Sequence, residues 1–471
     1  MTIQFSHQRT SPAPVANPPQ RCRSAGKTIA FSVVVGAMSA LVLVLVVFAG
    51  GNEATITGAL LLGFAFGWAL IATLTVRRTL QPQRWALVPA GAMGATGAAL
   101  VVFTPGNQAL TTMSWVWPPL LLTLAVWMFV QVRRSVPGKA RWILTMLTAV
   151  LALASIGATY DNIARIGDTD YAVPGNLYDV GGHRLHLDCR GHGSPTVVLS
   201  NSLGGVSAGW ARIQGPVAAT TRVCAYDRAG QGWSDEAERP RDGIESAEDL
   251  HTLLAAAGEH GPYVLVGHST GGTYAMTYAA RYPQQVAGLV LLDSSSPDQF
   301  TRMPAFAGQY AKMRRASALL PTLSRLGLGR LVPATSHLPT ADAAKVTAIT
   351  SGQQAYRNQR DEVSVIPEVF AQAQALTTLG DLPLAVLTAS ENSDGIEGWA
   401  GAQDELAALS VNHIHRTVDS THTGLLEDTG PATESIRAIV EVITSARTGT
   451  PVGAHGQSQP IEPAPNPGRS A

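Results

Sequence analysis

The first third of the chain is dominated by four long runs that contain no Asp, Glu, Lys or Arg. They cover 25, 23, 48 and 19 residues, and the polar turn Thr104–Gln108 interrupts the longest run near its middle. Because a helix needs about 20 apolar residues to cross the hydrocarbon core of a bilayer, the longest run has room for two helices. The pattern therefore predicts an all-α bundle of five transmembrane helices. The runs are Thr28–Asn52, Ala54–Val76, Trp85–Val132 and Trp142–Tyr160.

Neither a signal peptide nor a soluble helical core fits these runs as well as a membrane bundle does. A cleaved signal peptide would account for the first run alone, and no clear small-residue cleavage site ends that run. Buried helices of a soluble protein would carry a polar face, which these runs lack. The GxxxG spacing of Gly63 and Gly67 predicts close helix packing, within the bundle or between copies. Pro118 and Pro119 predict a kink in the fourth helix. We interpret the bundle as an anchor, with ligand sensing or partner binding as the alternative role.

Charge is balanced over the whole chain but not along it. Residues 1–160 hold eleven Lys and Arg and the single acid Glu53, which leaves 22 of the 33 bases and 32 of the 33 acids for the remainder. The bases recur before the first helix and in alternate loops, so the positive-inside rule places the N-terminus in the cytoplasm. Five crossings of the plasma membrane then put everything after Tyr160 outside. The net charge of zero gives no basic field, so nucleic acid is not an expected partner. The apolar runs make the lipid bilayer the expected partner.

From about Asn176 onward, short β-type runs alternate with helical ones. This alternation predicts an α/β domain with a mainly parallel sheet that is covered on both faces, and a hairpin through Gly181-Gly182 opens it. Residues 294–380 interrupt the alternation with a helical stretch that could form a cap over the strand ends. The predicted strands are Asn176–Val180, His183–Asp188, Thr196–Leu199, Arg222–Tyr226, Tyr263–Val266, Val286–Leu292, Leu382–Thr388 and Ile414–Val418.

These patterns divide the chain into four parts. Residues 1–26 and 447–471 are rich in Pro, and the second stretch also in Gly and Ser, so both are predicted to be disordered tails. Residues 27–160 form the predicted transmembrane domain. Residues 161–446 form the second domain, with its cap at about 294–380.

The strongest chemical signal is Gly267-His268-Ser269-Thr270-Gly271, which lies between a predicted strand and a predicted helix. This is the context of a nucleophile elbow, in which glycines permit a tight turn that presents the serine hydroxyl at the top of the sheet. We therefore interpret Ser269 as a nucleophile. No Gly-Lys-Ser/Thr follows, so a phosphate-binding loop does not fit.

A serine nucleophile needs a base within hydrogen-bond reach and an acid that orients the base. His422 is the candidate base, because it follows the last predicted strand in a loop that can reach over the sheet; a surface histidine is the alternative. Two acids compete to orient it. Asp293 directly ends a strand, whereas Asp394 lies in a polar loop after the next strand. We favour Asp293, because a strand end holds it rigidly, and its alternative role is that of a buried structural acid. His413 and His415 lie too early for the base, and no further ligand spacing supports a metal pair there.

Stabilisation of the oxyanion in acyl transfer needs two backbone N–H donors. Thr270, directly after the nucleophile, is the first predicted donor. The second is expected from the loop Asn201–Gly205, where we choose Leu203. A plain glycine turn is the alternative interpretation of this loop.

Together these pieces resemble the α/β-hydrolase family over residues 177–446. Asp227–Ser234 is similar to the D-R-x-G-x-G-x-S turn of that family, which is mainly structural. The resemblance implies an eight-stranded sheet, a helical lid and a Ser–acid–His triad whose acid follows the sixth strand in some members and the seventh in others. Asn201-Ser202 replaces the His-Gly of many relatives. The family's strand order would place Cys189 beside Cys224; outside the cytoplasm they can form a disulfide, although we slightly favour two buried free thiols.

The sequence thus predicts a membrane-anchored serine hydrolase that acts outside the cytoplasm through an acyl-enzyme intermediate, with no metal or organic cofactor. The predicted substrates are carboxylic esters of small-molecule or lipid-like acids, because alcohols leave more readily than amines and the family is rich in esterases. Amidase, peptidase, thioesterase and perhydrolase activities would use the same groups. A membrane ligand sensor without catalysis is the alternative of another class, and the complete set of Ser, His and acid disfavours it.

Overall fold

The computed structural model describes residues 25–136, 138–167, 172–331 and 336–454. Most of both predicted tails lies outside these residues. Helix α1 begins at Ala25 and helix α18 ends at Thr448, so two residues of each predicted tail are helical. The chain divides into two compact units, and the second includes short pieces of the N-terminal region. The first unit is Met1–Val47, Thr57–Thr104 and Leu120–Ala152; the second is Phe48–Ile56, Pro105–Pro119 and Leu153–Ala471.

Among the described residues, four helices are long and apolar enough to cross a membrane, or up to five if a bent helix pair is one span. The pair, α4 and α5, is bent by 49°. The break ends at Trp117, beside the prolines that predicted a kink. Helix α6 continues seven residues past the predicted domain boundary at residue 160. The boundary was placed where the apolar run ends, and the end of an apolar run does not mark the end of a helix. The helices are α1 (Ala25–Val42, continued by the π-helix Leu43–Val47), α2 (Glu53–Arg78), α3 (Leu87–Phe103, after the 3-10 turn Arg84–Ala86), α4 (Asn107–Met113), α5 (Trp117–Ser135) and α6 (Lys139–Gly167).

Small residues bring α1 and α2 together in the first unit. A Cβ atom on Gly63 would lie 2.3 Å from the Cα of Ala40, and one on Gly36 would lie 2.7 Å from the Cα of Gly67. Both distances are shorter than any side chain tolerates, so the two backbones approach this closely only through glycine. The GxxxG spacing thus serves packing within the bundle.

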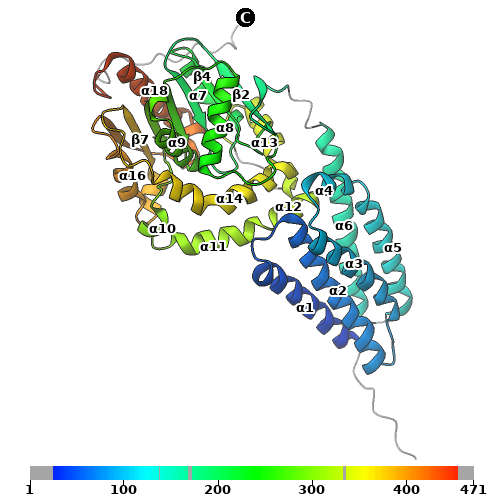
Figure 1. Cartoon of the computed structure of the whole chain (residues 1–471). Coiled ribbons are helices and arrows are strands. Elements are labelled where there is room, and N and C mark those ends of the chain that lie inside the picture. The colour runs from blue at the N-terminus through cyan, green and yellow to red at the C-terminus, as the bar shows by residue number, and fades with distance from the viewer. Residues whose placement is uncertain (1–24, 137, 168–171, 332–335, 455–471) are drawn as a thin grey trace, which may run out of the picture. The chain divides into compact units, whose positions relative to one another are not determined.

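The described part of the second unit contains an eight-stranded sheet in the order β1-β2-β4-β3-β5-β6-β7-β8. Figure 1 shows helices, among them α8 (Gly243–Ala256) and α9 (Thr270–Arg281), packed against this sheet. β1, β2 and β4 pair antiparallel, and all other neighbours pair parallel. Each predicted strand is present, with ends shifted by at most two residues. The strands are β1 (Asn176–Asp179), β2 (Arg184–Arg190), β3 (Thr196–Ser200), β4 (Val223–Tyr226), β5 (Tyr263–His268), β6 (Val286–Leu292), β7 (Leu384–Ala389) and β8 (His413–Val418).

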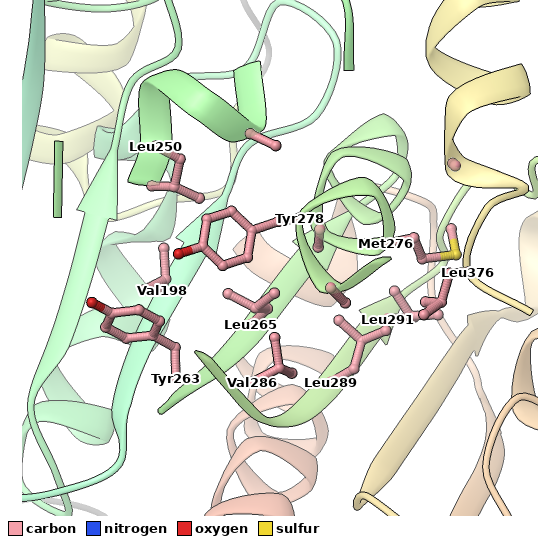
Figure 2. Close-up of a cluster of buried hydrophobic side chains, with 14 of the residues drawn as sticks. Val198, Leu250, Tyr263, Leu265, Met276, Tyr278, Val286, Leu289, Leu291 and Leu376 are labelled. Carbon is pink, nitrogen blue, oxygen red and sulfur yellow. The ribbon is translucent and has the colours of Figure 1, made fainter. Parts of the chain in front are cut away.

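Side chains alternate between two hydrophobic clusters, one on each face of the sheet. Leu265 of β5 belongs to the first cluster, whereas its neighbours Val264 and Val266 belong to the second. Figure 2 shows part of the first cluster, where Tyr278 and Leu250 reach the strands from two helices. The first face is covered by α8 (Gly243–Ala256), α9 (Thr270–Arg281) and α16 (Trp399–Ala407), and the second by α7 (Ala211–Ala218) and α18 (Thr429–Thr448).

The stretch between β6 and β7 is helical, as predicted for a cap. Its longest helix, α14, packs on α9 through a small apolar cluster that includes Tyr274, Val363 and Phe370. Because α9 follows the Ser269 turn directly, this contact brings the cap next to the candidate nucleophile's helix. The cap helices are α10 (Gln299–Arg302), α11 (Phe306–Ser317), α12 (Leu320–Arg325), the 3-10 helix Leu328–Leu331, α13 (Thr340–Thr350) and α14 (Gln353–Ala373).

Cys189 and Cys224 form a disulfide between β2 and β4. The antiparallel register of these strands sets the two residues directly opposite each other. The slight preference for free thiols is therefore wrong. The family's strand order indicated that the cysteines are neighbours, but the register that pairs them residue by residue was not readable from the sequence.

Candidate active site

Ser269 occupies a sharp turn between β5 and α9. Its backbone has φ +56° and ψ −126°, a conformation that residues other than glycine adopt only where the surrounding structure enforces it. Backbone bonds hold the turn on both sides: the Ser269 N–H donates to the carbonyl of Leu292 at 3.1 Å, and the Ser295 N–H donates to the Ser269 carbonyl at 3.0 Å. The strained turn is the local geometry that the elbow motif predicts.

Two glycines of the motif are required by close backbone approach. A Cβ atom on Gly267 would lie 2.5 Å from the Cα of Gly272. One on Gly271 would lie 2.3 Å from the carbonyl oxygen of Ser200 at the end of β3. Helix α9 can therefore begin this close to the sheet only if these positions have no side chain.

Asp293, directly after β6, and His422, in the loop after β8, lie side by side. Oδ2 of Asp293 is 2.5 Å from Nδ1 of His422. The carboxylate is fully buried at the end of β6, and the residue has φ +43°. Since the ring nitrogen that faces a carboxylate carries the proton, Nε2 of His422 is left as the acceptor, which is the tautomer that a general base needs.

Several neighbours that the sequence did not reveal hold this pair. Trp399 Nε1 donates to Oδ1 of Asp293 at 2.8 Å, and Asn392 Nδ2 donates to Oδ2 at 2.6 Å. The backbone N–H of His422 donates to Glu391 at 2.8 Å. The signal for Trp399 was its indole N–H, which needs an acceptor when it is buried. Asn392 and Glu391 belong to the polar loop in which Asp394 was weighed as the acid.

Asp394 is exposed on α15 (Ser390–Gly395), and His422 is paired with Asp293 instead. The loop after β7 thus lies next to the histidine, but it contributes an amide and a different carboxylate. The roles of Ser269, His422 and Asp293 in a reaction stay predictions.

The loop Asn201–Gly205 lies beside this site. Its Gly204 N–H donates to Glu362 at 2.8 Å, and its Gly205 N–H donates to the Ser202 carbonyl at 3.1 Å, so both amides are engaged. Leu203 remains the predicted oxyanion donor of the loop. Thr270 is the first residue of α9, and the first N–H groups of a helix have no acceptor within the helix, so its amide suits the role predicted for it.

A cavity of about 270 Å³ borders the loop. Its wall is mainly apolar, with Leu203, Trp210 and Leu426, and it reaches His268 and the residue after His422. The cavity therefore lies between the loop of the predicted oxyanion donor and the loop that carries the candidate base.

Two groups of side chains with metal-binding atoms are engaged otherwise in the described structure. Cys189, Cys224 and Glu259 lie close together, but the sulfurs are joined in the disulfide and offer no thiolate. His413 contacts a backbone carbonyl at 2.7 Å, whereas His415 contacts a hydroxyl at 2.8 Å and a carboxylate at 3.0 Å. Each histidine thus has its own partners on the protein.

His268, the residue before the candidate nucleophile, is buried and neutral. Burial, and secondarily the neighbouring His422, lowers its pKa to about 3. Its Nε2 lies 2.9 Å from the backbone carbonyl of His422, so the neutral ring donates its Nε2–H there. His268 therefore helps to position the loop that carries the candidate base.

This low pKa makes stability depend on pH. Below pH 6.5 the unfolded chain binds a proton at His268 that the folded chain does not bind, so the free energy of unfolding falls as the pH falls. We expect acidification from pH 7 to pH 5 to remove roughly 2 kcal/mol through this residue. Thermal unfolding at the two pH values should show this loss in the wild type and a smaller one in His268→Gln, with the exposed His260→Gln as the control. Equal pH dependence in all three proteins would contradict the assignment.

The comparisons with known proteins agree with this architecture. The protein-family model described as alpha/beta hydrolase fold matches residues 195–328. The crystal structure of the Cif epoxide hydrolase from Acinetobacter nosocomialis is similar with a TM-score of 0.50 at 15% sequence identity, over 61% of this chain and 96% of that one. The chain therefore carries a domain with the α/β-hydrolase fold, preceded by apolar helices.

Curated relatives are similar over parts of the chain. An uncharacterized protein of Schizosaccharomyces pombe is 27% identical over 61% of this chain and 59% of its own length. A 2-hydroxy-6-oxononadienedioate/2-hydroxy-6-oxononatrienedioate hydrolase of Paraburkholderia xenovorans is 35% identical over 26% of this chain and 44% of its own length. This chain thus spans less than two thirds of the length of either relative.

Proposed function

We propose that this protein is a membrane-anchored serine hydrolase whose substrates are carboxylic esters. The observation that carries the proposal is the 2.5 Å contact between the buried carboxylate of Asp293 and Nδ1 of His422, in a fold whose strained turn presents Ser269. The hydrolase named among the relatives supports the same class of reaction.

In the proposed reaction, Oγ of Ser269 attacks the acyl carbonyl carbon while Nε2 of His422 takes the hydroxyl proton. Asp293 orients the ring and stabilises its cation. The N–H groups of Leu203 and Thr270 stabilise the oxyanion of the tetrahedral intermediate. His422 then gives the proton to the leaving alcohol, and an acyl ester of Ser269 forms. A water molecule, deprotonated by His422, attacks this ester and releases the carboxylic acid and the free serine.

The apolar cavity borders the loop Asn201–Gly205, which we call the oxyanion loop, and it supports an acyl group as the part of the substrate that is buried. An alcohol is a better leaving group than an amine, which favours esters over amides. Small-molecule or lipid-like acyl esters are therefore the proposed substrate class.

We also infer that the N-terminus is cytoplasmic and that the hydrolase domain lies outside the plasma membrane. The four apolar helices and the bent pair supply the crossings. The arginines Arg77, Arg78, Arg133 and Arg134 end α2 and α5, and the positive-inside rule assigns these ends to the cytoplasm.

One experiment tests both the reaction and the topology. Sealed right-side-out membrane vesicles are treated with a membrane-impermeant fluorophosphonate, which reacts with an activated serine. We expect labelling of the wild type and of the control Ser364→Ala, and none of Ser269→Ala. Hydrolysis of short p-nitrophenyl esters should fall at least about a thousandfold in Ser269→Ala.

The possible failures are distinguishable. A folded wild type that stays unlabelled even after the vesicles are opened, or a Ser269→Ala variant that retains turnover, would overturn the hydrolase proposal. Labelling that appears only after the vesicles are opened would leave the reaction intact and overturn the topology.

A further inference from the structure

The cap helix α14 reaches the oxyanion loop through one buried carboxylate, that of Glu362. Its Oε2 accepts the hydrogen bond from the Gly204 N–H at 2.8 Å, and its Oε1 accepts one from Arg228 Nη2 at 2.6 Å. The side chains of Glu362 and Arg228 are only 9% and 5% exposed. Charge-assisted hydrogen bonds are short and strong where water is excluded. Glu362 therefore fixes the amide of Gly204, the residue directly after the predicted oxyanion donor Leu203.

Arg228 extends this hold to the carbonyl groups of the same loop. Its Nη1 donates to the Asn201 carbonyl at 2.7 Å, and its Nη2 donates to the Ser202 carbonyl at 3.2 Å. Its guanidinium also lies 4.1 Å from the ring centre of Tyr274 on α9. Burial opposes the charge of Arg228 most strongly, but Glu362, Tyr274 and Tyr226 together outweigh burial, so the pKa of the guanidinium is raised. Arg228, from the turn Asp227–Ser234, thus supplies a permanent cation that ties the oxyanion loop to the cap.

The first residue of α14 lies in a second buried polar group, which we call the buried charge cluster: Glu53, Asp161, Arg325, Arg330 and Gln353. Gln353 Nε2 donates to Asp161 at 2.7 Å, and its Oε1 accepts from Arg325 Nη1 at 2.9 Å. Arg325 pairs with Glu53, and Arg330 donates to Asp161 at 2.8 Å. All five residues belong to the second unit. Glu53 opens α2 and Asp161 lies in the last turns of α6, so two apolar helices supply the acids of the cluster.

We propose that Glu362 is a positioning residue for the oxyanion loop, and that the buried charge cluster holds α14 in the place from which Glu362 reaches that loop. Gln353 and Glu362 are nine positions apart in one unbroken helix, about 14 Å, and a helix transmits a displacement over this length. The ends of α2 and α6 thereby help to set the geometry of the candidate oxyanion hole. The kinetic part of this proposal rests on the proposed hydrolase function, whereas the structural part does not.

The positioning role of Glu362 is tested with the full chain in lipid nanodiscs and the variant Glu362→Gln. The matched control is Glu368→Gln, which changes an exposed glutamate on the same helix. Hydrogen exchange of the peptide that contains Gly204 should become about tenfold faster in Glu362→Gln and should not change in the control. Exchange in β3 and β5 should stay slow, which separates a local release from general unfolding. Turnover of the ester should fall about tenfold in kcat with KM within twofold. Unchanged exchange at Gly204 would overturn the proposal.

The role of the buried charge cluster is tested with the double variant Glu53→Gln/Arg325→Gln, which removes both charges of one ion pair. We expect faster exchange at Gly204, and we expect the triple variant with Glu362→Gln to show the kcat of Glu362→Gln alone. A fall in the kcat of the triple variant that equals the product of the falls in the double variant and in Glu362→Gln would overturn the link between the cluster and the loop. If the double variant does not fold, Gln353→Met, which leaves both ion pairs in place, is measured by the same criteria. If Ser269 proves unreactive, the hydrogen exchange still decides the structural part.

Discussion

Asp293→Asn is expected to lower kcat for ester hydrolysis by about three to four orders of magnitude. The carboxylate accepts hydrogen bonds from Trp399 and Asn392 as well as from the ring of His422. An amide at this position would turn an N–H toward one of these donors, or toward the ring, and the histidine would lose the partner that selects its tautomer. The fall should appear in kcat, because the substrate does not touch this side chain.

The matched control for this substitution is Asp394→Asn, which makes the same change on the exposed face of α15. We expect its kcat to stay within twofold of the wild type. Initial rates with a short-chain p-nitrophenyl ester give both values. A large loss in Asp394→Asn together with an active Asp293→Asn would show that the acid has been assigned to the wrong strand end.

Gly271→Ala is expected to lower the free energy of unfolding of the second unit by about 3 kcal/mol or more. The new methyl group would lie 2.3 Å from one backbone carbonyl and 2.6 Å from the next, at Ser200 and Asn201. Neither oxygen can move without displacing the end of β3, so the start of α9 would have to shift away from the sheet.

Gly215→Ala provides the matched control, since it is also a helical glycine of the second unit and a Cβ there meets nothing within 4 Å. Alanine is the better helix former by up to about 1 kcal/mol, so we expect this variant to be as stable as the wild type or slightly more stable. Thermal and denaturant unfolding of the two purified variants measure the difference. If both alanines are tolerated alike, the close packing of α9 on β3 is wrong.

The pattern of hydrophobic residues predicted the strands from β3 to β7 because these are almost entirely buried and leave an unbroken apolar signal. Every strand from β1 to β8 was found within two residues of its predicted bounds, and the cap was found between β6 and β7. The choice of Asp293 over Asp394 rested on the rigidity of a strand end, and the structure places Asp293 beside His422. The part that this pair plays in catalysis stays a prediction.

Partners that meet only in three dimensions could not be predicted. Trp399 of α16 and Asn392 of α15 lie about 100 residues after Asp293, and no spacing rule relates their positions to the carboxylate. Glu362 is one of several charged residues on an amphipathic helix, and its burial depends on how the cap packs. The pairing of Cys189 with Cys224 depends on register, which one residue of slippage would change.

The division of the chain into units has a consequence for any attempt to isolate the domain with the α/β-hydrolase fold. A fragment that begins after α6 would lack Glu53 and Asp161, so the buried side chain of Arg325 would lose its ion-pair partner and Arg330 would lose its contact with Asp161. Removing the apolar helices would therefore also remove part of the scaffold of the second unit. Purification of the full chain, and not truncation, is the route that keeps the second unit intact.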